Sequence, residues 1–186
     1  AAGKHMVLRV YADYPKKPPA MPEWLLKKGV TQKAYEDYGG GLSPDYDHPA
    51  MVSALERLVT AMGKRYDKHP RVAFVQLGLL GFWGEWHTYP RNELFASEKT
   101  RRRVLEAYRK AFPNKQLMAR YGDGLPGQYP KMGFHDDMFP EDTDNGKSWS
   151  FLERLRRAKR IDSWKTTIIG GEMTPPHAKK WLGAKW

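Results

Sequence analysis

Two kinds of hydrophobic pattern alternate along the chain. Apolar residues run almost continuously through residues 6–12 and 72–80, whereas in 51–62 they recur every three or four positions. A continuous apolar run is typical of a strand buried on both faces of a parallel sheet. The three-to-four spacing is typical of an amphipathic helix. The pattern therefore predicts a strand, a helix and a second strand in the first half of the chain.

The same alternation continues in the second half. Ser97 is placed to cap a basic helix, and Leu152 and Leu155 mark another helix. Further strands are expected at 116–121, 132–134 and 165–170. Strands separated by helices indicate βαβ units and a parallel sheet.

The long segment before the first helix is rich in proline and glycine. It contains Gly39-Gly40-Gly41 and has no clear hydrophobic period, so it is expected to be a loop. At its end, Asp47 is expected to cap the first helix, with Pro49 in the first turn.

The count of strands bears on the fold. Five strand-helix units fit in 186 residues, whereas a complete (β/α)8 barrel has about 250 residues. The first five residues resemble the end of a helix that leads into a strand. We therefore expect an α/β fold of the (β/α)8 TIM-barrel type, an incomplete barrel covering strands 3 to 7, with residues 1–186 as one domain fragment. A complete, open doubly wound domain is the alternative.

Charge widens the range of partners. The 32 Lys and Arg against 21 Asp and Glu leave a net charge of +11, which attracts nucleic acid, anionic membranes or acidic polysaccharides. The basic clusters fall mostly in predicted helices, where they are usually a solvated face, so nucleic acid is not favoured. No apolar run is long enough to span a membrane. Cysteine is absent, which excludes disulfides and thiolate metal sites.

Polar and aromatic residues follow the predicted strands. In parallel α/β folds, ligands bind at the carboxyl ends of the strands. The candidate site residues at these ends are Tyr14, Trp83, Glu85, Trp86, His87, Arg120, His135, Asp137 and Glu172.

Two of these residues are glutamates, Glu85 and Glu172, and a glycine precedes each. Glycoside hydrolysis needs two carboxyl groups, one to protonate the leaving oxygen and one to attack the anomeric carbon or activate water. Trp83 and Trp86 lie on either side of Glu85 and suit the apolar face of a sugar ring. The alternative is that one tryptophan covers the core and Glu85 forms a buried ion pair with Arg9 or Arg120.

Three stretches carry a family resemblance: GGGLSPDYDHP, RYDKHPRVAFVQLGLLGFWGEWHTYP and IIGGEMTP. They resemble a bacterial glycoside-hydrolase-like family on a TIM-barrel scaffold, of the DUF4832/DUF4874 type, and more distantly the clan of retaining glycosidases. The similarity runs from Gly3 to about Pro176. It implies that 6–12 is barrel strand three, 72–80 strand four and 165–170 strand seven. The resemblance also implies a secreted or periplasmic protein.

The resemblance assigns roles to the two glutamates. Glu85 matches the acid/base of the clan and Glu172 its nucleophile, with the other candidate residues binding substrate. The clan has Asn before the acid/base, where this chain has Gly84, so the usual contact with the sugar 2-hydroxyl has to come from elsewhere.

The expected function is cleavage of a glycosidic bond in an oligo- or polysaccharide, which the charge allows to be acidic, by a two-glutamate retaining mechanism. The first alternative is a non-catalytic carbohydrate-binding barrel, or an inactive fragment of the enzyme. A basic nucleic-acid-binding module is a second alternative, weakened because the basic residues lie on predicted outer helices. No HxH or HExxH spacing occurs, so no metal and no cofactor are expected.

Overall fold

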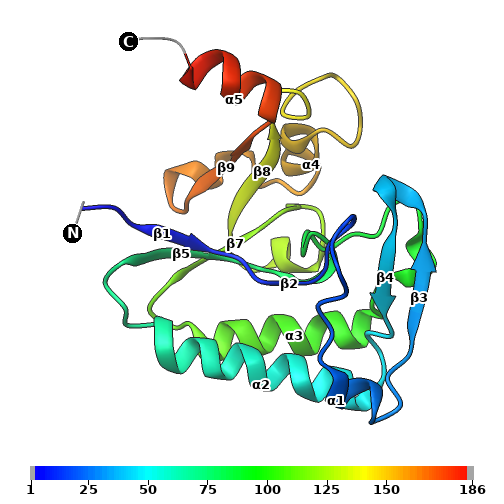
Figure 1. Cartoon of the computed structure of the whole chain (residues 1–186). Coiled ribbons are helices and arrows are strands. Elements are labelled where there is room, and N and C mark those ends of the chain that lie inside the picture. Colours follow the sequence, from blue (N-terminus) through cyan, green and yellow to red (C-terminus); the bar gives the residue numbers. More distant parts are fainter. Residues whose placement is uncertain (1–2, 184–186) are drawn as a thin grey trace. The chain divides into compact units, whose positions relative to one another are not determined.

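A computed structural model describes residues 3–183 of the chain (Figure 1). The chain divides into two compact units, Ala1–Lys115 and Gln116–Trp186.

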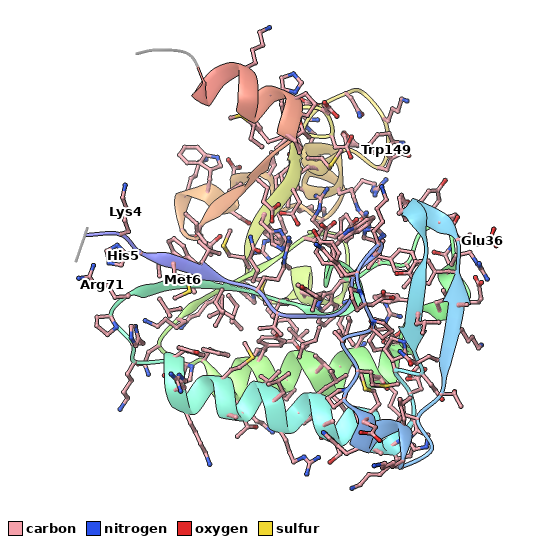
Figure 2. The ribbon with its side chains drawn as sticks, in the orientation of Figure 1. Lys4, His5, Met6, Glu36, Arg71 and Trp149 are labelled. Atoms are coloured by element: carbon pink, nitrogen blue, oxygen red, sulfur yellow. The ribbon has the colours of Figure 1, made fainter. Side chains whose placement is uncertain are left out.

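The first unit contains three strand pairs. Two are parallel and one is an antiparallel hairpin: β1 (Met6–Leu8) with β5 (Val72–Gln76), β2 (Tyr11–Asp13) with β6 (Leu79–Phe82), and β3 (Gln32–Tyr35) with β4 (Gly41–Pro44). The register of β1 places Met6 opposite Val72. Beside this pair Arg71 Nη1 donates a 3.3 Å hydrogen bond to the Lys4 carbonyl oxygen, at the start of β1 (Figure 2).

Both long apolar runs of the first unit are divided into two short strands. The division falls at the same level in each run, where Leu79 N donates a 2.6 Å hydrogen bond to the Val10 carbonyl oxygen. A Cβ atom at Gly78 would overlap that same oxygen. Leu79 itself has a φ of 71°. The close approach of the two backbones therefore needs glycine and interrupts both strands.

Two long helices pack together in the first unit, α2 (Pro49–Tyr66) and α3 (Glu98–Ala111). The predicted stripe of α2 is buried, including Met51, Leu55 and Val59. Gly63 lies directly against Ala111, with no room for a Cβ between them. The amphipathic pattern of this helix is thus confirmed.

The cap of α2 differs from the prediction. His48 is the N-cap, and its Nδ1 accepts a 3.2 Å hydrogen bond from Ala50 N. Asp47 instead binds the beginning of α3, where its carboxylate accepts hydrogen bonds from Ser97 and Thr100. Ser97 caps α3 as predicted, accepting from Thr100 N. The sequence does not predict this role of Asp47, because its hydrogen-bond partner Ser97 lies 50 residues away along the chain.

The predicted loop before α2 contains regular structure. A short helix, α1 (Glu23–Leu26), is followed by the β3–β4 hairpin, and a 3-10 turn, η1 (Asp37–Gly39), joins its strands. Gly39 and Gly40 have φ values of 90° and 85°, which the turn requires. The sequence predicts a loop at these glycines, and in the structure they form the turn of a hairpin. A second 3-10 turn, η2 (Asn92–Leu94), precedes α3.

The second unit holds three parallel strands in the order β7 (Gln116–Ala119), β8 (Gly133–Phe139) and β9 (Ile169–Met173). Between β7 and β8 lies the 3-10 turn η3 (Leu125–Gln128). Between β8 and β9 lie α4 (Phe151–Arg157) and the 3-10 helix η4 (Ile161–Lys165), and α5 (Pro175–Leu182) follows β9. The last strand thus begins later than the predicted 165–170.

The expectation of an incomplete (β/α)8 TIM barrel is wrong. Residues 3–183 form five α-helices, of which α1 has four residues and α4 has seven. A 3-10 turn and no α-helix connects β7 to β8, and β3 and β4 are antiparallel. A barrel needs a helix after each strand of one parallel sheet. The chain is instead a mixed α/β protein with short parallel strands. None of its described helices has the length and apolar character to cross a membrane.

Candidate functional site

A tight turn follows β6 in the first unit and presents Trp83, Glu85 and His87. Backbone hydrogen bonds close it, from Phe82 N to the His87 carbonyl oxygen at 2.8 Å and from Glu85 N to the Phe82 carbonyl oxygen at 2.9 Å. Gly81 has a φ of 76°, and a Cβ there would overlap the His87 carbonyl oxygen. The glycine therefore allows the chain to fold back and hold the three side chains together.

Two tryptophans of this turn have a strained backbone. Trp83 has a φ of 54° and Trp86 a φ of 61°. This left-handed conformation costs a non-glycine residue about 1–2 kcal/mol. Such residues gather at functional sites, where the surrounding structure holds them in place.

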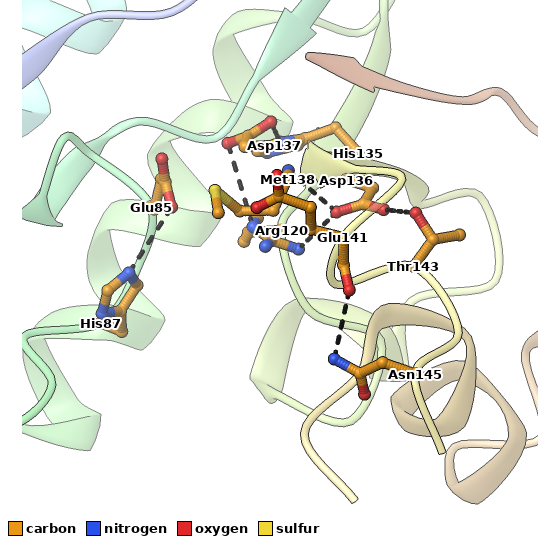
Figure 3. A network of polar contacts seen from close by, with 10 residues as sticks. All are labelled: Glu85, His87, Arg120, His135, Asp136, Asp137, Met138, Glu141, Thr143 and Asn145. Carbon is orange, nitrogen blue, oxygen red and sulfur yellow. Dashed lines mark hydrogen bonds and ion pairs between the residues drawn. The ribbon is translucent and has the colours of Figure 1, made fainter. Parts of the chain in front are cut away.

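The carboxylate of Glu85 faces the ring of His87 (Figure 3). Glu85 Oε2 lies 3.5 Å from His87 Nε2, and the side chains are 14% and 21% exposed. His87 Nδ1 accepts a 3.2 Å hydrogen bond from Tyr89 N. In the neutral ring the proton is therefore on Nε2, where it points to the glutamate. This places a half-buried carboxylate and an N–H donor side by side at the turn.

Trp83 is half-buried and packs against the cluster of Tyr35, Phe82 and Leu94. Its ring centroid lies 6.0 Å from that of His87. Trp83, Glu85 and His87, all predicted from the sequence, thus lie together in one unit.

Trp86 and Tyr14 have different surroundings. Trp86 is 8% exposed, and its indole Nε1 donates a 3.1 Å hydrogen bond to the Gly78 carbonyl oxygen. The only polar atom of the Trp86 side chain is thus hydrogen-bonded to the backbone between β5 and β6. Tyr14 is half-buried, and its ring lies 4.8 Å from that of Tyr11.

A second polar cluster is formed by Arg120, which directly follows β7, and by residues 135–137 within β8 (Figure 3). Arg120 Nη1 lies 3.5 Å from Asp136 Oδ1, and Arg120 Nε lies 4.0 Å from Asp137 Oδ2. His135 Nδ1 lies 2.7 Å from Asp137 Oδ1. All four side chains are at least nine-tenths buried. The predicted residues Arg120, His135 and Asp137 are thus in contact, and the aspartate orients the imidazole.

Glu172 lies within β9, and its side chain is exposed. It follows Gly171, which has a φ of 150° and whose added Cβ would overlap the Asp136 carbonyl oxygen. The glycine lets β9 approach β8 closely at this point. Glu85 belongs to the first unit and Glu172 to the second, so the pairing of the two carboxyl groups stays a prediction.

Two residues of the β3–β4 hairpin escaped the sequence analysis. Tyr38 lies 4.9 Å from Trp83, measured between ring centroids, and Tyr35 donates a hydrogen bond to Asp13. The sequence predicts a loop over this segment. It therefore gives no reason to expect that these aromatic residues contact the turn after β6. The three consecutive glycines, residues 39–41, were the available signal for a tight turn.

Across residues 3–183, no group of three or more His, Asp or Glu side chains is arranged to hold a metal ion. Comparison with protein-family models, with curated proteins and with solved structures finds no match to this chain. The local chemistry of the two polar clusters is therefore what indicates a function for this chain.

Proposed function

We propose that this chain is a glycoside-hydrolase-like protein that cleaves a glycosidic bond by a two-glutamate retaining mechanism. The observation that supports it is the turn after β6, where the Glu85 carboxylate faces His87 and Trp83 lies beside them. A carboxyl group is what glycoside chemistry uses at its acid/base position, and an aromatic ring beside it suits the apolar face of a sugar ring.

The proposed mechanism has two steps. Glu172 attacks the anomeric carbon with its carboxylate while protonated Glu85 gives its proton to the leaving oxygen, which breaks the glycosidic bond and forms a glycosyl ester. Glu85, now ionised, takes a proton from water as the water oxygen attacks the anomeric carbon. The ester bond to Glu172 then breaks and Glu85 is again protonated. In this scheme the His87 N–H holds the Glu85 carboxylate in position.

Aryl glycosides test the mechanism directly. We expect the purified chain to release 4-nitrophenol from at least one member of a panel of 4-nitrophenyl glycosides. Both Glu85→Gln and Glu172→Gln should lower kcat by about 10²–10⁴-fold. Glu98→Gln is the matched control, because Glu98 is an exposed residue of α3 paired with Arg102. Azide should restore turnover of Glu85→Ala and yield a glycosyl azide of retained configuration.

Two results would refute catalysis. One is the absence of hydrolysis by the unaltered chain across the panel. The other is hydrolysis that both glutamine variants retain.

A non-catalytic carbohydrate-binding protein is the second candidate. It is favoured by the exposure of Glu172 on β9, because a nucleophile is ordinarily held in a shielded site. The aromatic and polar groups around Glu85 are assembled within the first unit without it. Sugar binding that survives Glu172→Gln, with no hydrolysis by either protein, would select this candidate.

A further inference from the structure

Tyr38 is an exposed aromatic residue at the turn of the β3–β4 hairpin. Its side chain is 42% exposed, and its ring stands edge-on to Trp83, at an interplanar angle of 66°. Beneath both rings lies Phe82, which is fully buried. The two rings therefore form a corner with two apolar walls on a rigid aromatic base.

Both walls of the corner have a strained backbone. Tyr38 has a φ of 54° and a ψ of 22°, and Trp83 also has a φ of 54°. Asn or Gly would adopt this conformation at less cost than a bulky aromatic residue. The turn nevertheless carries tyrosine, which suggests that the ring has a use beyond the turn itself.

Polar groups surround the rim of the corner. Burial raises the pKa of the Tyr38 hydroxyl, and the electrostatic effects of Tyr89, Asp37 and Glu85 raise it further. The geometry also places the corner beside Glu85, because the Trp83 ring lies 6.0 Å from that of His87 and His87 lies against Glu85.

We propose that Tyr38 and Trp83 form a subsite that holds one pyranose ring of a neutral oligosaccharide next to Glu85. This inference rests on the proposed function and adds the class of substrate. The apolar C–H face of the sugar would lie on one ring while its edge contacts the other. Its hydroxyl groups would reach Glu85 and the Tyr38 hydroxyl.

The preference for a neutral sugar follows from the charges at the rim. Glu85 and Asp37 contribute carboxylates. Arg91 Nε lies 2.6 Å from Glu93 Oε1, and its Nη1 lies 3.7 Å from Asp37 Oδ2, so this cation is already paired with carboxylates. A sugar carboxylate would meet like charge here. The side chain of Lys16 also lies against Gly39, next to Tyr38, so the three carboxylates of Asp37, Glu85 and Glu93 outnumber the cations Arg91 and Lys16 around this turn.

The test uses the full chain and hexasaccharide probes. Binding of cellohexaose, mannohexaose and xylohexaose, as neutral probes, and of hexagalacturonate, as the acidic probe, is measured by isothermal titration calorimetry. We expect at least one neutral probe to bind more tightly than hexagalacturonate. In Tyr38→Asn the Kd for that probe should rise about tenfold, a typical loss for one aromatic contact.

Measurements of Tm and two further variants distinguish a role of the Tyr38 ring in binding from a role in folding. Asn suits a positive φ, so Tyr38→Asn should keep or raise Tm while it weakens binding. A purely structural role for the ring would lower Tm and affinity together. Tyr38→Phe keeps the ring and loses only the hydroxyl contact, so it should raise Kd by less than Tyr38→Asn does. Trp24→Ala is the matched control, because Trp24 is 41% exposed on α1 and should leave binding unchanged.

The outcomes distinguish this inference from the proposed function. Neutral probes that bind equally well to Tyr38→Asn would refute the subsite, and tighter binding of hexagalacturonate would refute the neutral class. In both cases hydrolysis of aryl glycosides that depends on Glu85 would leave the proposed function standing. A chain that neither binds the probes nor cleaves the aryl glycosides would overturn both.

Discussion

The Tyr35 hydroxyl donates a 2.6 Å hydrogen bond to Asp13 Oδ1, and this contact joins the β3–β4 hairpin to the end of β2. Both side chains are buried, with 4% and 3% exposed. The hairpin that carries Tyr38 is therefore tied to a strand of the same unit by a carboxylate with little access to water.

The buried Asp13 carboxyl group predicts an unusual pH dependence. Burial raises its pKa above the ordinary value of 3.8, although the hydrogen bond from Tyr35 opposes the change. Because the folded pKa exceeds the unfolded one, the contribution of Asp13 to stability is fully present below pH 3.8 and is lost as the pH rises through the folded pKa.

We therefore expect Asp13→Asn to be more stable than the unaltered chain at pH 7, with the difference shrinking toward pH 4. Urea denaturation at both pH values measures it. Asp162→Asn, at a side chain 70% exposed, is the control and should show no such trend. A less stable Asp13→Asn at pH 7 would contradict the expectation.

Asp47 should behave in the opposite way. Burial acts to raise the pKa of its carboxyl group, but hydrogen bonds from Ser97 and Thr100 outweigh burial and lower it. A lowered folded pKa contributes stability above the unfolded pKa, and this is lost as the pH falls through the folded pKa. We expect Asp47→Ala to cost about 1–2 kcal/mol of unfolding free energy at pH 7, as for a lost helix cap.

The loss from Asp47→Ala should diminish as the pH falls from the unfolded pKa of 3.8 through the lower folded pKa, since the carboxyl group of the unaltered chain becomes protonated over that range. Asp162→Ala, at a side chain 70% exposed, is the comparison and should show no such change. An equal loss at both pH values would show that the charge does not stabilise the start of α3.

Arg120 is expected to be needed for the stability of the second unit. Its side chain is 6% exposed and lies against Asp136 and Asp137. Replacing it with methionine leaves buried carboxylates without their cation, a change that typically costs about 3–5 kcal/mol. Arg156→Met removes a cation from exposed pairs with Asp144 and Glu153 and should cost much less. Guanidinium denaturation curves of equal stability would argue against this role.

Gly171 offers a backbone test in the same unit. Its φ of 150° disfavours any side chain, and an added Cβ would overlap the Asp136 carbonyl oxygen. We expect Gly171→Ala to lower the unfolding free energy by more than about 2 kcal/mol, since β8 and β9 would have to separate.

Gly146→Ala is the matched control for this change. Gly146 also has a positive φ, 74°, but an added Cβ meets no atom within 4 Å. Its cost should be only the backbone strain, about 1–2 kcal/mol. Similar melting temperatures for the two variants would show that the close approach of β9 to β8 does not limit stability.

Features that depend on neighbouring residues were readable from the sequence. The stripe of α2 and the cap at Ser97 repeat over a few positions, so local periodicity predicts them. The grouping of Trp83, Glu85 and His87 is likewise local, because one turn of five residues holds them. Arg120 directly follows β7, as predicted, but His135 and Asp137 lie within β8, so the pairing of β7 with β8 and not the order of residues brings the three together.

The remaining features arise from contacts between distant segments. Gly78 lies against the backbone of Val10, Asp47 accepts a hydrogen bond from Ser97, and the Tyr38 ring contacts that of Trp83. Each contact joins residues more than 40 positions apart. The hydrophobic period gives no information about such pairs. It indicates which face of an element is buried but not which residues pack against that face. The two long amphipathic helices and their buried faces could therefore be predicted from the order of residues. The divided strands, the hairpin and the aromatic corner followed from backbone approach and side-chain packing in three dimensions.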